Sequence, residues 1–148
     1  MLYTAVRYDG PIAVRYPRGK GIGVELDKEL QEMPLGKAEV LREGRDITLI
    51  GIGPMVYTCL AAADELHYRG LEATVINLRF INPLDSETVL HYARLTKKIV
   101  TVEDHMLNGG MGSAVLECLA DEGLTGVAVE RLGYTDFVEH GTVSTLHQ

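Results

Sequence analysis

The chain has 148 residues, of which 46% are hydrophobic and 24% charged, and its formal net charge is −7. This length and composition predict a single soluble globular domain with a buried core. The negative charge argues against nucleic-acid binding, because proteins that contact phosphates need clustered lysine and arginine. No stretch reaches the roughly 18 apolar residues of a membrane span, and no signal peptide is evident. We therefore expect a cytoplasmic protein that neither binds nucleic acid nor inserts into a membrane.

The first 35 residues differ in character from the remainder of the chain. They are rich in turn-forming residues, and the glycine-rich stretch 19–23 can bend freely. The charged stretch 25–32 lacks a stripe of apolar residues that could face a core. This region is interpreted as a crossing between domains.

From Gly36 onward, strand and helix patterns alternate. Residues 37–42 and 47–52 read as two strands joined by a short turn at 43–46, which predicts a hairpin at one edge of a sheet. A helix is expected to begin at Pro54, whose fixed φ suits a first helical turn, and to end at Gly70, which can adopt a left-handed conformation.

The same alternation continues to the end of the chain. Residues 73–78, 99–102 and 127–129 form short apolar, β-branched runs, and Asp85 is placed to cap the helix that follows the first of them. A further helix is expected over 113–119. Because the strands are nearly continuous in apolar residues, both faces of the sheet must be covered. The predicted fold is α/β with three layers: a mostly parallel five-stranded sheet with one antiparallel edge strand.

The arginine-containing segment VRYPRG at residues 14–19 is the first candidate for chemistry. Arg15 and Arg18 flank a rigid proline and precede a glycine-rich turn, and a guanidinium group can donate paired hydrogen bonds to phosphate. Arginines beside a turn are also commonly solvated or ion-paired. The residues alone leave both interpretations open.

Two further candidates lie together near the end of the apolar strand expected at 99–102. The glycine-rich turn LNGGMGS at 107–113 could bind an anion through its amides, although close packing of helix on sheet is the favoured interpretation. Glu103, Asp104 and His105 occupy the carboxyl end of the strand, where open α/β sheets place ligand contacts. They could serve in acid–base chemistry or cap the next helix.

The remaining polar groups give weaker signals. Residues 136–141 bring two carboxylates and His140 into one turn, too few ligands for a metal site. Cys59 and Cys118 lack the spacing of a zinc site or disulfide framework and are expected to be free thiols. Since no phosphate loop or nucleophile elbow is present, we assign no catalytic, cofactor-binding or metal-binding residue.

Several segments, taken in order, resemble the 1-deoxy-D-xylulose-5-phosphate synthase family. They are residues 9–19, 78–85, 102–105, 107–113 and 139–141. The family belongs to the transketolase-like enzymes, which have a diphosphate-binding, a pyrimidine-binding and a C-terminal domain. The resemblance implies that residues 1–18 are the final helix and strand of the pyrimidine-binding domain, 19–35 a linker, and 36–148 the C-terminal domain without its last helix.

The resemblance also implies an activity for the parent enzyme. The family condenses pyruvate with glyceraldehyde 3-phosphate to 1-deoxy-D-xylulose 5-phosphate and CO₂, a precursor of isoprenoids, thiamine and pyridoxal, using thiamine diphosphate and Mg²⁺. The family's motifs for that cofactor are absent from this chain, so the fragment alone is expected to bind neither group and to be inactive. Arg15 and, less strongly, Arg18 are expected to contact the phosphate of the aldehyde.

The expected partners are the other domains of the same polypeptide, a second copy in a homodimer, and small-molecule substrates. Two alternatives remain open. The chain could be the C-terminal domain of a transketolase or of a 2-oxo-acid dehydrogenase β subunit, or a module that serves assembly alone.

Overall fold

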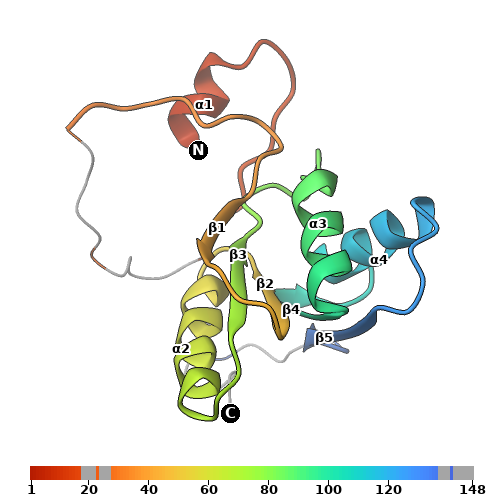
Figure 1. Cartoon of the computed structure of the whole chain (residues 1–148). Helices are drawn as coiled ribbons and strands as arrows, with labels where there is room; N and C mark the ends of the chain where they lie inside the picture. Colours follow the sequence, from red (N-terminus) through yellow and green to blue (C-terminus); the bar gives the residue numbers. More distant parts are fainter. Residues whose placement is uncertain (18–22, 24–27, 137–140, 142–148) are drawn as a thin grey trace.

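The computed structural model describes residues 1–17, 23, 28–136 and 141, and its centre is one five-stranded sheet (Figure 1). The strand order is β1-β3-β2-β4-β5. Strands β2 to β5 run parallel to their neighbours, and β1 lies antiparallel to β3 at one edge. This arrangement confirms the predicted α/β fold with its antiparallel edge strand. The strands are β1 (Glu39–Arg42), β2 (Ile47–Gly51), β3 (Ala73–Asn77), β4 (Lys98–Met106) and β5 (Ala128–Tyr134).

Helices cover both faces of the sheet. Helix α2 (Met55–Tyr68) packs on one face, while α3 (Ser86–Thr96) and α4 (Met111–Asp121) pack on the other (Figure 1). Successive strand side chains point to opposite faces. Leu49 therefore joins the core beneath α2, whereas its neighbour Ile50 joins the core beneath α3 and α4. Burial on both sides explains why the strands lack polar alternation.

The predicted hairpin between the first two strands is wrong. Strand β1 pairs with β3, Val40 lying opposite Ile76, and β3 separates it from β2. The connection from β1 to β2 therefore crosses the amino end of β3. There the Gly44 amide donates to Thr74 Oγ1 at 3.0 Å, and the Thr74 hydroxyl donates to the Gly44 carbonyl at 2.7 Å. A short turn in the sequence predicted neighbouring strands, but the residues that pair with β1 lie 33 to 38 positions further along the chain.

The predicted helix signals at Gly70 and Asp85 are confirmed. Gly70 adopts a φ of 80° directly after α2. Asp85 caps α3, since its Oδ1 accepts from the Thr88 amide at 3.3 Å. Its Oδ2 accepts from the Ala38 amide at 2.9 Å, so one buried carboxylate joins the start of α3 to the chain entering β1.

Stability is expected to depend on pH through Asp85. Burial favours its neutral form, but hydrogen bonds from the Ala38 and Thr88 amides and the nearby Lys37 outweigh burial and lower its pKa below 3.8. Because the folded pKa is the lower one, the contribution is present above the unfolded pKa and is lost as pH falls through the folded value. Urea unfolding should show that the free energy of unfolding falls between about pH 6 and pH 2.5, and this fall should be smaller in Asp85→Asn. An unchanged pH dependence in that variant would contradict this role.

The N-terminal segment lies at one end of the molecule, beyond the sheet (Figure 1). Helix α1 (Leu2–Arg7) is held by residues 32–33: Thr4 Oγ1 is buried and accepts from the Met33 amide at 2.9 Å, and Arg7 pairs with Glu32. The resemblance implied a strand after this helix, but residues 11–17 form none.

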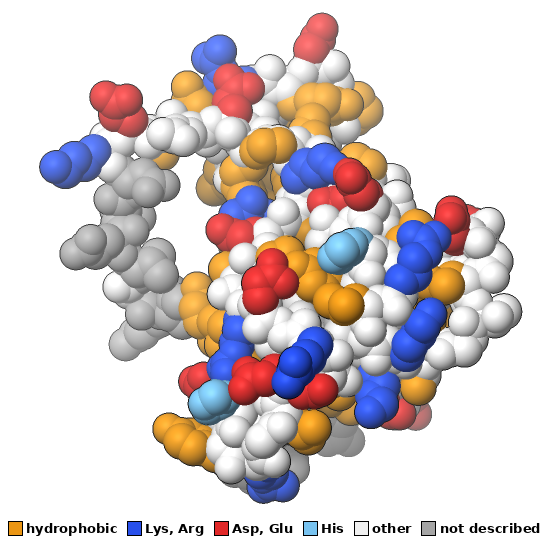
Figure 2. All heavy atoms as spheres, in the orientation of Figure 1, with side chains coloured by type: hydrophobic (Ala, Val, Ile, Leu, Met, Phe, Trp, Pro, Cys, Tyr) orange, Lys and Arg blue, Asp and Glu red, His pale blue; other side chains and the backbone are white. Residues whose placement is uncertain are grey.

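Apolar side chains gather at the end of the molecule that carries α1 (Figure 2). Val6 is 85% exposed, and Leu2 and Tyr16 are also largely exposed. On the same view, lysine and arginine lie among aspartate and glutamate without forming one basic patch. Among the described residues, no helix is long and apolar enough to cross a membrane.

Candidate functional site

At the carboxyl ends of β2 and β4, the chain connections leave toward opposite faces of the sheet. These strands are neighbours and parallel, but β2 continues into α2 on one face and β4 into α4 on the other. Open α/β sheets bind ligands at such a switch point, because the two connections leave a crevice between them. The end of β4, residues 103–106, borders this position.

Strand β4 contains a bulge at this end. Val102 pairs with Leu132 and Met106 with Tyr134, so four positions along β4 match two along β5. Gly133 faces the bulge, where a Cβ atom would lie 2.8 Å from the His105 carbonyl oxygen. A side chain there would displace backbone, so glycine permits the bulge. Bulges re-aim side chains, and they occur often beside binding sites.

The bulge directs Glu103 beneath the first turn of α4. Its buried carboxylate accepts from the Met111 amide at 2.7 Å through Oε2 and from the Gly112 amide at 2.9 Å through Oε1. The helix N-cap residue, Gly110, has no side chain to do this. The helix-capping interpretation of Glu103 is therefore confirmed, and its two hydrogen bonds take the amides that an anion would need.

The glycine-rich turn serves close packing, as the favoured interpretation predicted. A Cβ on Gly112 would lie 2.7 Å from Thr101 Oγ1, so glycine lets α4 approach β4. The Gly109 amide donates to Ser113 Oγ at 3.2 Å, and the Ser113 hydroxyl donates to the Leu107 carbonyl at 2.8 Å. Arg131 donates to that same carbonyl at 3.1 Å. The turn is thus fixed by internal hydrogen bonds.

Arg15 reaches the bulge from the N-terminal segment. Its Nη2 donates to the Asp104 carbonyl oxygen at 3.3 Å, although 89 positions separate the two residues. The Tyr134 hydroxyl donates to Asp104 Oδ1 at 3.0 Å. The structure therefore places a predicted phosphate contact beside the switch point. Arg18, the second predicted contact, lies outside the described residues.

Sequence reasoning missed Tyr134. The last strand was predicted to end at residue 129, whereas β5 continues to Tyr134. Burial raises the pKa of Tyr134, and its hydrogen bond to Asp104 raises it further. The hydroxyl therefore stays protonated near neutral pH and acts as a donor.

The histidines give no assembled acid–base site in the described part of the chain. His105 Nδ1 lies 3.0 Å from the Met106 carbonyl, which assigns the ring proton to Nδ1. His67 Nδ1 lies 2.8 Å from Glu72 Oε1 on the surface. Residues 137–140, including His140, are outside the described residues. Among the residues that are described, no three acidic, histidine or cysteine groups gather as metal ligands.

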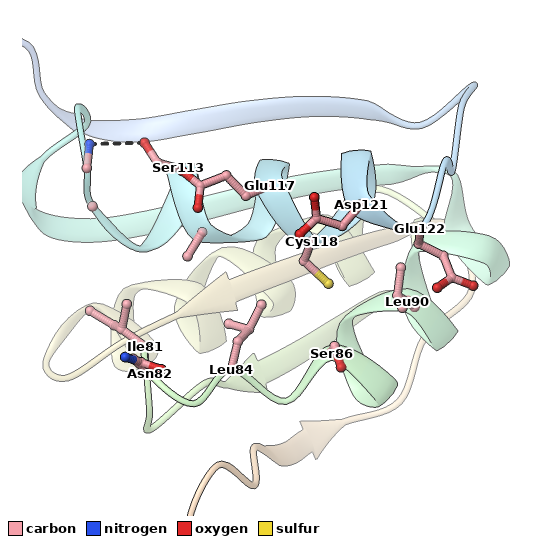
Figure 3. Close-up of a pocket in the computed structure, with 13 residues that line it drawn as sticks. Ile81, Asn82, Leu84, Ser86, Leu90, Ser113, Glu117, Cys118, Asp121 and Glu122 are labelled. Atoms are coloured by element: carbon pink, nitrogen blue, oxygen red, sulfur yellow. Dashed lines mark hydrogen bonds between the residues drawn. The ribbon is translucent and has the colours of Figure 1, made fainter.

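A groove of about 650 Å³ lies between α3 and α4 and borders the glycine-rich turn at Gly109, Gly110 and Ser113 (Figure 3). Its wall is apolar at Ile81 and Leu84. Helix α4 contributes Glu117 and Asp121, and Glu122 follows directly after the helix. Carboxylates along one wall repel an anionic ligand. The groove is therefore a poorer place for a phosphate than the edge where Arg15 lies.

Both cysteines are free thiols, as expected. Burial raises the pKa of Cys59 to about 11. Burial, with Asp121 and Glu122, also raises the pKa of Cys118. Since the thiolate is the reactive form, neither side chain is suited to act as a nucleophile near neutral pH.

An open, mostly parallel sheet with polar contacts at the carboxyl ends of its strands defines a doubly wound α/β domain. Comparison with known families gives a more specific assignment. Residues 36–148 match the family model described as "Transketolase, C-terminal domain", and the chain belongs to this family.

The chain is similar to longer proteins over nearly all its length. It is 70% identical over 148 residues to a 1-deoxy-D-xylulose-5-phosphate synthase of Desulfitobacterium hafniense, and 58% identical over 142 residues to synthase 1 of Geobacter sulfurreducens. It spans only 24% and 22% of these relatives. A solved structure titled "Split gene transketolase, inactive beta4 tetramer" matches with a TM-score of 0.73 and 35% identity, covering 78% of this chain and 38% of that one.

Proposed function

We propose that this chain is the C-terminal domain of a 1-deoxy-D-xylulose-5-phosphate synthase. The observation that carries the proposal is the 70% identity to such a synthase across all 148 residues. The intact enzyme would join pyruvate and glyceraldehyde 3-phosphate with release of CO₂. Because the chain spans 24% of that relative, the remaining length supplies the other domains.

Thiamine diphosphate and Mg²⁺ belong to those other domains in this proposal. In the described residues, the amides of Met111 and Gly112 at the start of α4 already bind Glu103, so they offer no cradle for a diphosphate. No group of three acidic, histidine or cysteine ligands is found in the same residues. The chain's own part in catalysis is then to position the acceptor substrate and shape the edge of the site.

Arg15 is the residue proposed to hold the acceptor's phosphate. Its guanidinium group carries five N–H donors, and the bond to the Asp104 carbonyl uses one of them. The side chain is exposed, and its hydrogen bond to Asp104 places it beside the switch point, so a ligand can approach it. A guanidinium group binds phosphate oxygens through charge-assisted hydrogen bonds. Arg18 is proposed as a second contact.

Arg15→Ala in the full-length enzyme is expected to raise the KM for glyceraldehyde 3-phosphate about tenfold or more, because a hydrogen bond between charged groups contributes roughly 1.5–3 kcal/mol. The KM for pyruvate should stay within about twofold, since pyruvate carries no phosphate. Steady-state assays of 1-deoxy-D-xylulose 5-phosphate formation measure both constants.

Arg45→Ala is the matched control. Arg45 is also exposed but precedes β2, at the opposite end of the parallel strands, and its replacement should leave both constants unchanged. An unchanged aldehyde KM in Arg15→Ala would contradict the phosphate contact. A full-length enzyme that releases no CO₂ from pyruvate would contradict the synthase assignment itself.

A second candidate role is assembly without ligand contact. It is favoured by the exposed apolar side chains Leu2, Val6 and Tyr16 on the N-terminal segment, a typical feature of surfaces that meet other domains. In this case the domain contributes to the homodimer interface or forms part of the active-site wall without binding a ligand itself. Wild-type kinetics for Arg15→Ala would favour this alternative.

A further inference from the structure

We propose that Tyr134 is a positioning residue for the acceptor phosphate: by holding Asp104 it fixes the backbone carbonyl that orients Arg15. This inference rests on the proposed function. Tyr134 itself is not a phosphate ligand in this scheme, because its hydroxyl donates to Asp104 Oδ1 at 3.0 Å.

The end of β4 needs such support because the bulge interrupts regular pairing. Between the Val102–Leu132 pair and the Met106–Tyr134 pair, β4 carries two residues more than β5. Backbone in a bulge leaves the regular ladder of hydrogen bonds. Its conformation must then be set largely by side chains.

Hydrogen bonds fix two consecutive side chains of the bulge. Glu103 is fixed beneath α4 by two amide hydrogen bonds of 2.7 and 2.9 Å. The next residue, Asp104, is held by the hydroxyl of Tyr134 on β5. The Leu107 amide also donates to the Tyr134 carbonyl at 2.8 Å, so Tyr134 contacts the bulge through both side chain and backbone. Removing the hydroxyl releases only the Asp104 side of this arrangement.

Arg15 depends on this arrangement because its own segment offers no regular structure. Residues 11–17 form neither helix nor strand, and within the described residues Arg15 is joined to the sheet domain by the 3.3 Å hydrogen bond to the Asp104 carbonyl. A guanidinium group that binds phosphate must be held within about half an ångström of its productive position. A displacement of the Asp104 carbonyl would therefore displace the Arg15 guanidinium group and weaken its contact with the phosphate.

The test is Tyr134→Phe in the full-length enzyme, which removes one oxygen and keeps the ring. The KM for glyceraldehyde 3-phosphate should rise about threefold to tenfold, the effect of one neutral-donor hydrogen bond. Both kcat and the KM for pyruvate should stay within about twofold. Tyr68→Phe, which removes an exposed hydroxyl at the end of α2, is the control and should match the wild type.

A second acceptor separates positioning from general damage. D-glyceraldehyde lacks the phosphate, so its kcat/KM should be the same in Tyr134→Phe and wild type. In the double variant, Tyr134→Phe should not raise the KM for glyceraldehyde 3-phosphate beyond the value reached by Arg15→Ala alone. Asp104→Ala removes the acceptor of the same hydrogen bond and should raise the KM for glyceraldehyde 3-phosphate at least as much as Tyr134→Phe does.

The outcomes distinguish this inference from the function on which it rests. If Arg15→Ala raises the KM and Tyr134→Phe does not, Tyr134 has no positioning role while the phosphate contact stands. If Tyr134→Phe lowers kcat/KM equally with glyceraldehyde 3-phosphate and with D-glyceraldehyde, the positioning role is also contradicted, because an equal loss indicates a general structural role. If the wild-type enzyme forms no 1-deoxy-D-xylulose 5-phosphate, the proposed function itself fails.

Discussion

Replacing Glu103 by alanine is expected to lower the free energy of unfolding of this chain by about 3 kcal/mol, since each buried donor left without a partner costs roughly 1–3 kcal/mol. The variant leaves the amides of Met111 and Gly112 unpaired beneath the protein surface. It also removes a negative charge from the positive end of the α4 dipole. A loss of this size is a large fraction of the roughly 5–15 kcal/mol that holds a domain folded.

Urea unfolding followed by circular dichroism measures this effect. Glu130→Ala is the control: that carboxylate is exposed on β5, and its removal should change stability by no more than about 0.5 kcal/mol. Glu103→Gln keeps one acceptor oxygen and should fall between the wild type and Glu103→Ala. If Glu103→Ala were as stable as the control, the first turn of α4 would have other partners.

The second large effect is expected at the crossing over β3. A Cβ on Gly44 would lie 2.5 Å from the Glu72 carbonyl oxygen and 2.6 Å from the Thr74 amide nitrogen. These are backbone atoms of a chain held in the sheet, so they cannot move aside as a flexible side chain does. Gly44→Ala is therefore expected to destabilise the chain by about 3 kcal/mol, the upper end of the usual cost of overpacking.

Gly53→Ala separates steric overlap from backbone strain. Gly53 has a φ of 58° but open space around the position of a Cβ. Its replacement should cost about 1–2 kcal/mol, the penalty of a left-handed conformation. Urea midpoints of the two variants give the comparison. If Gly44→Ala cost no more than Gly53→Ala, the crossing would be looser than the structure indicates.

The parts of the fold that the sequence predicted correctly depend on local chemistry. Gly70 ends a helix because of its own φ, and Asp85 caps one because of an amide three residues away. The choice of partner for β1 is a tertiary property, decided by whether Val40 packs beside Ile76. No feature of the turn at 43–46 contains that information, which is why the hairpin prediction was wrong.

In the candidate site, too, local chemistry could be predicted from the sequence and tertiary contacts could not. Arg15 was proposed from the chemistry of a guanidinium group beside a proline, but its position at β4 depends on a hydrogen bond that spans 89 residues. The bulge at residues 103–105 could not be predicted, because polar residues at the end of an apolar run indicate a strand that stops. Tyr134 was missed because the last strand was predicted to end at residue 129, so its contact with Asp104 was not expected.

The position of β3 between β1 and β2 also governs the order of events when the chain is made. Strand β1 begins at residue 39, but its neighbour in the sheet begins at residue 73. Contacts between distant segments form late, because the intervening chain must first be ordered. During synthesis, β1 emerges with no edge to join until residues 73–77 have followed it. Whatever precedes β1 in the polypeptide therefore gains its attachment to this sheet only after that delay.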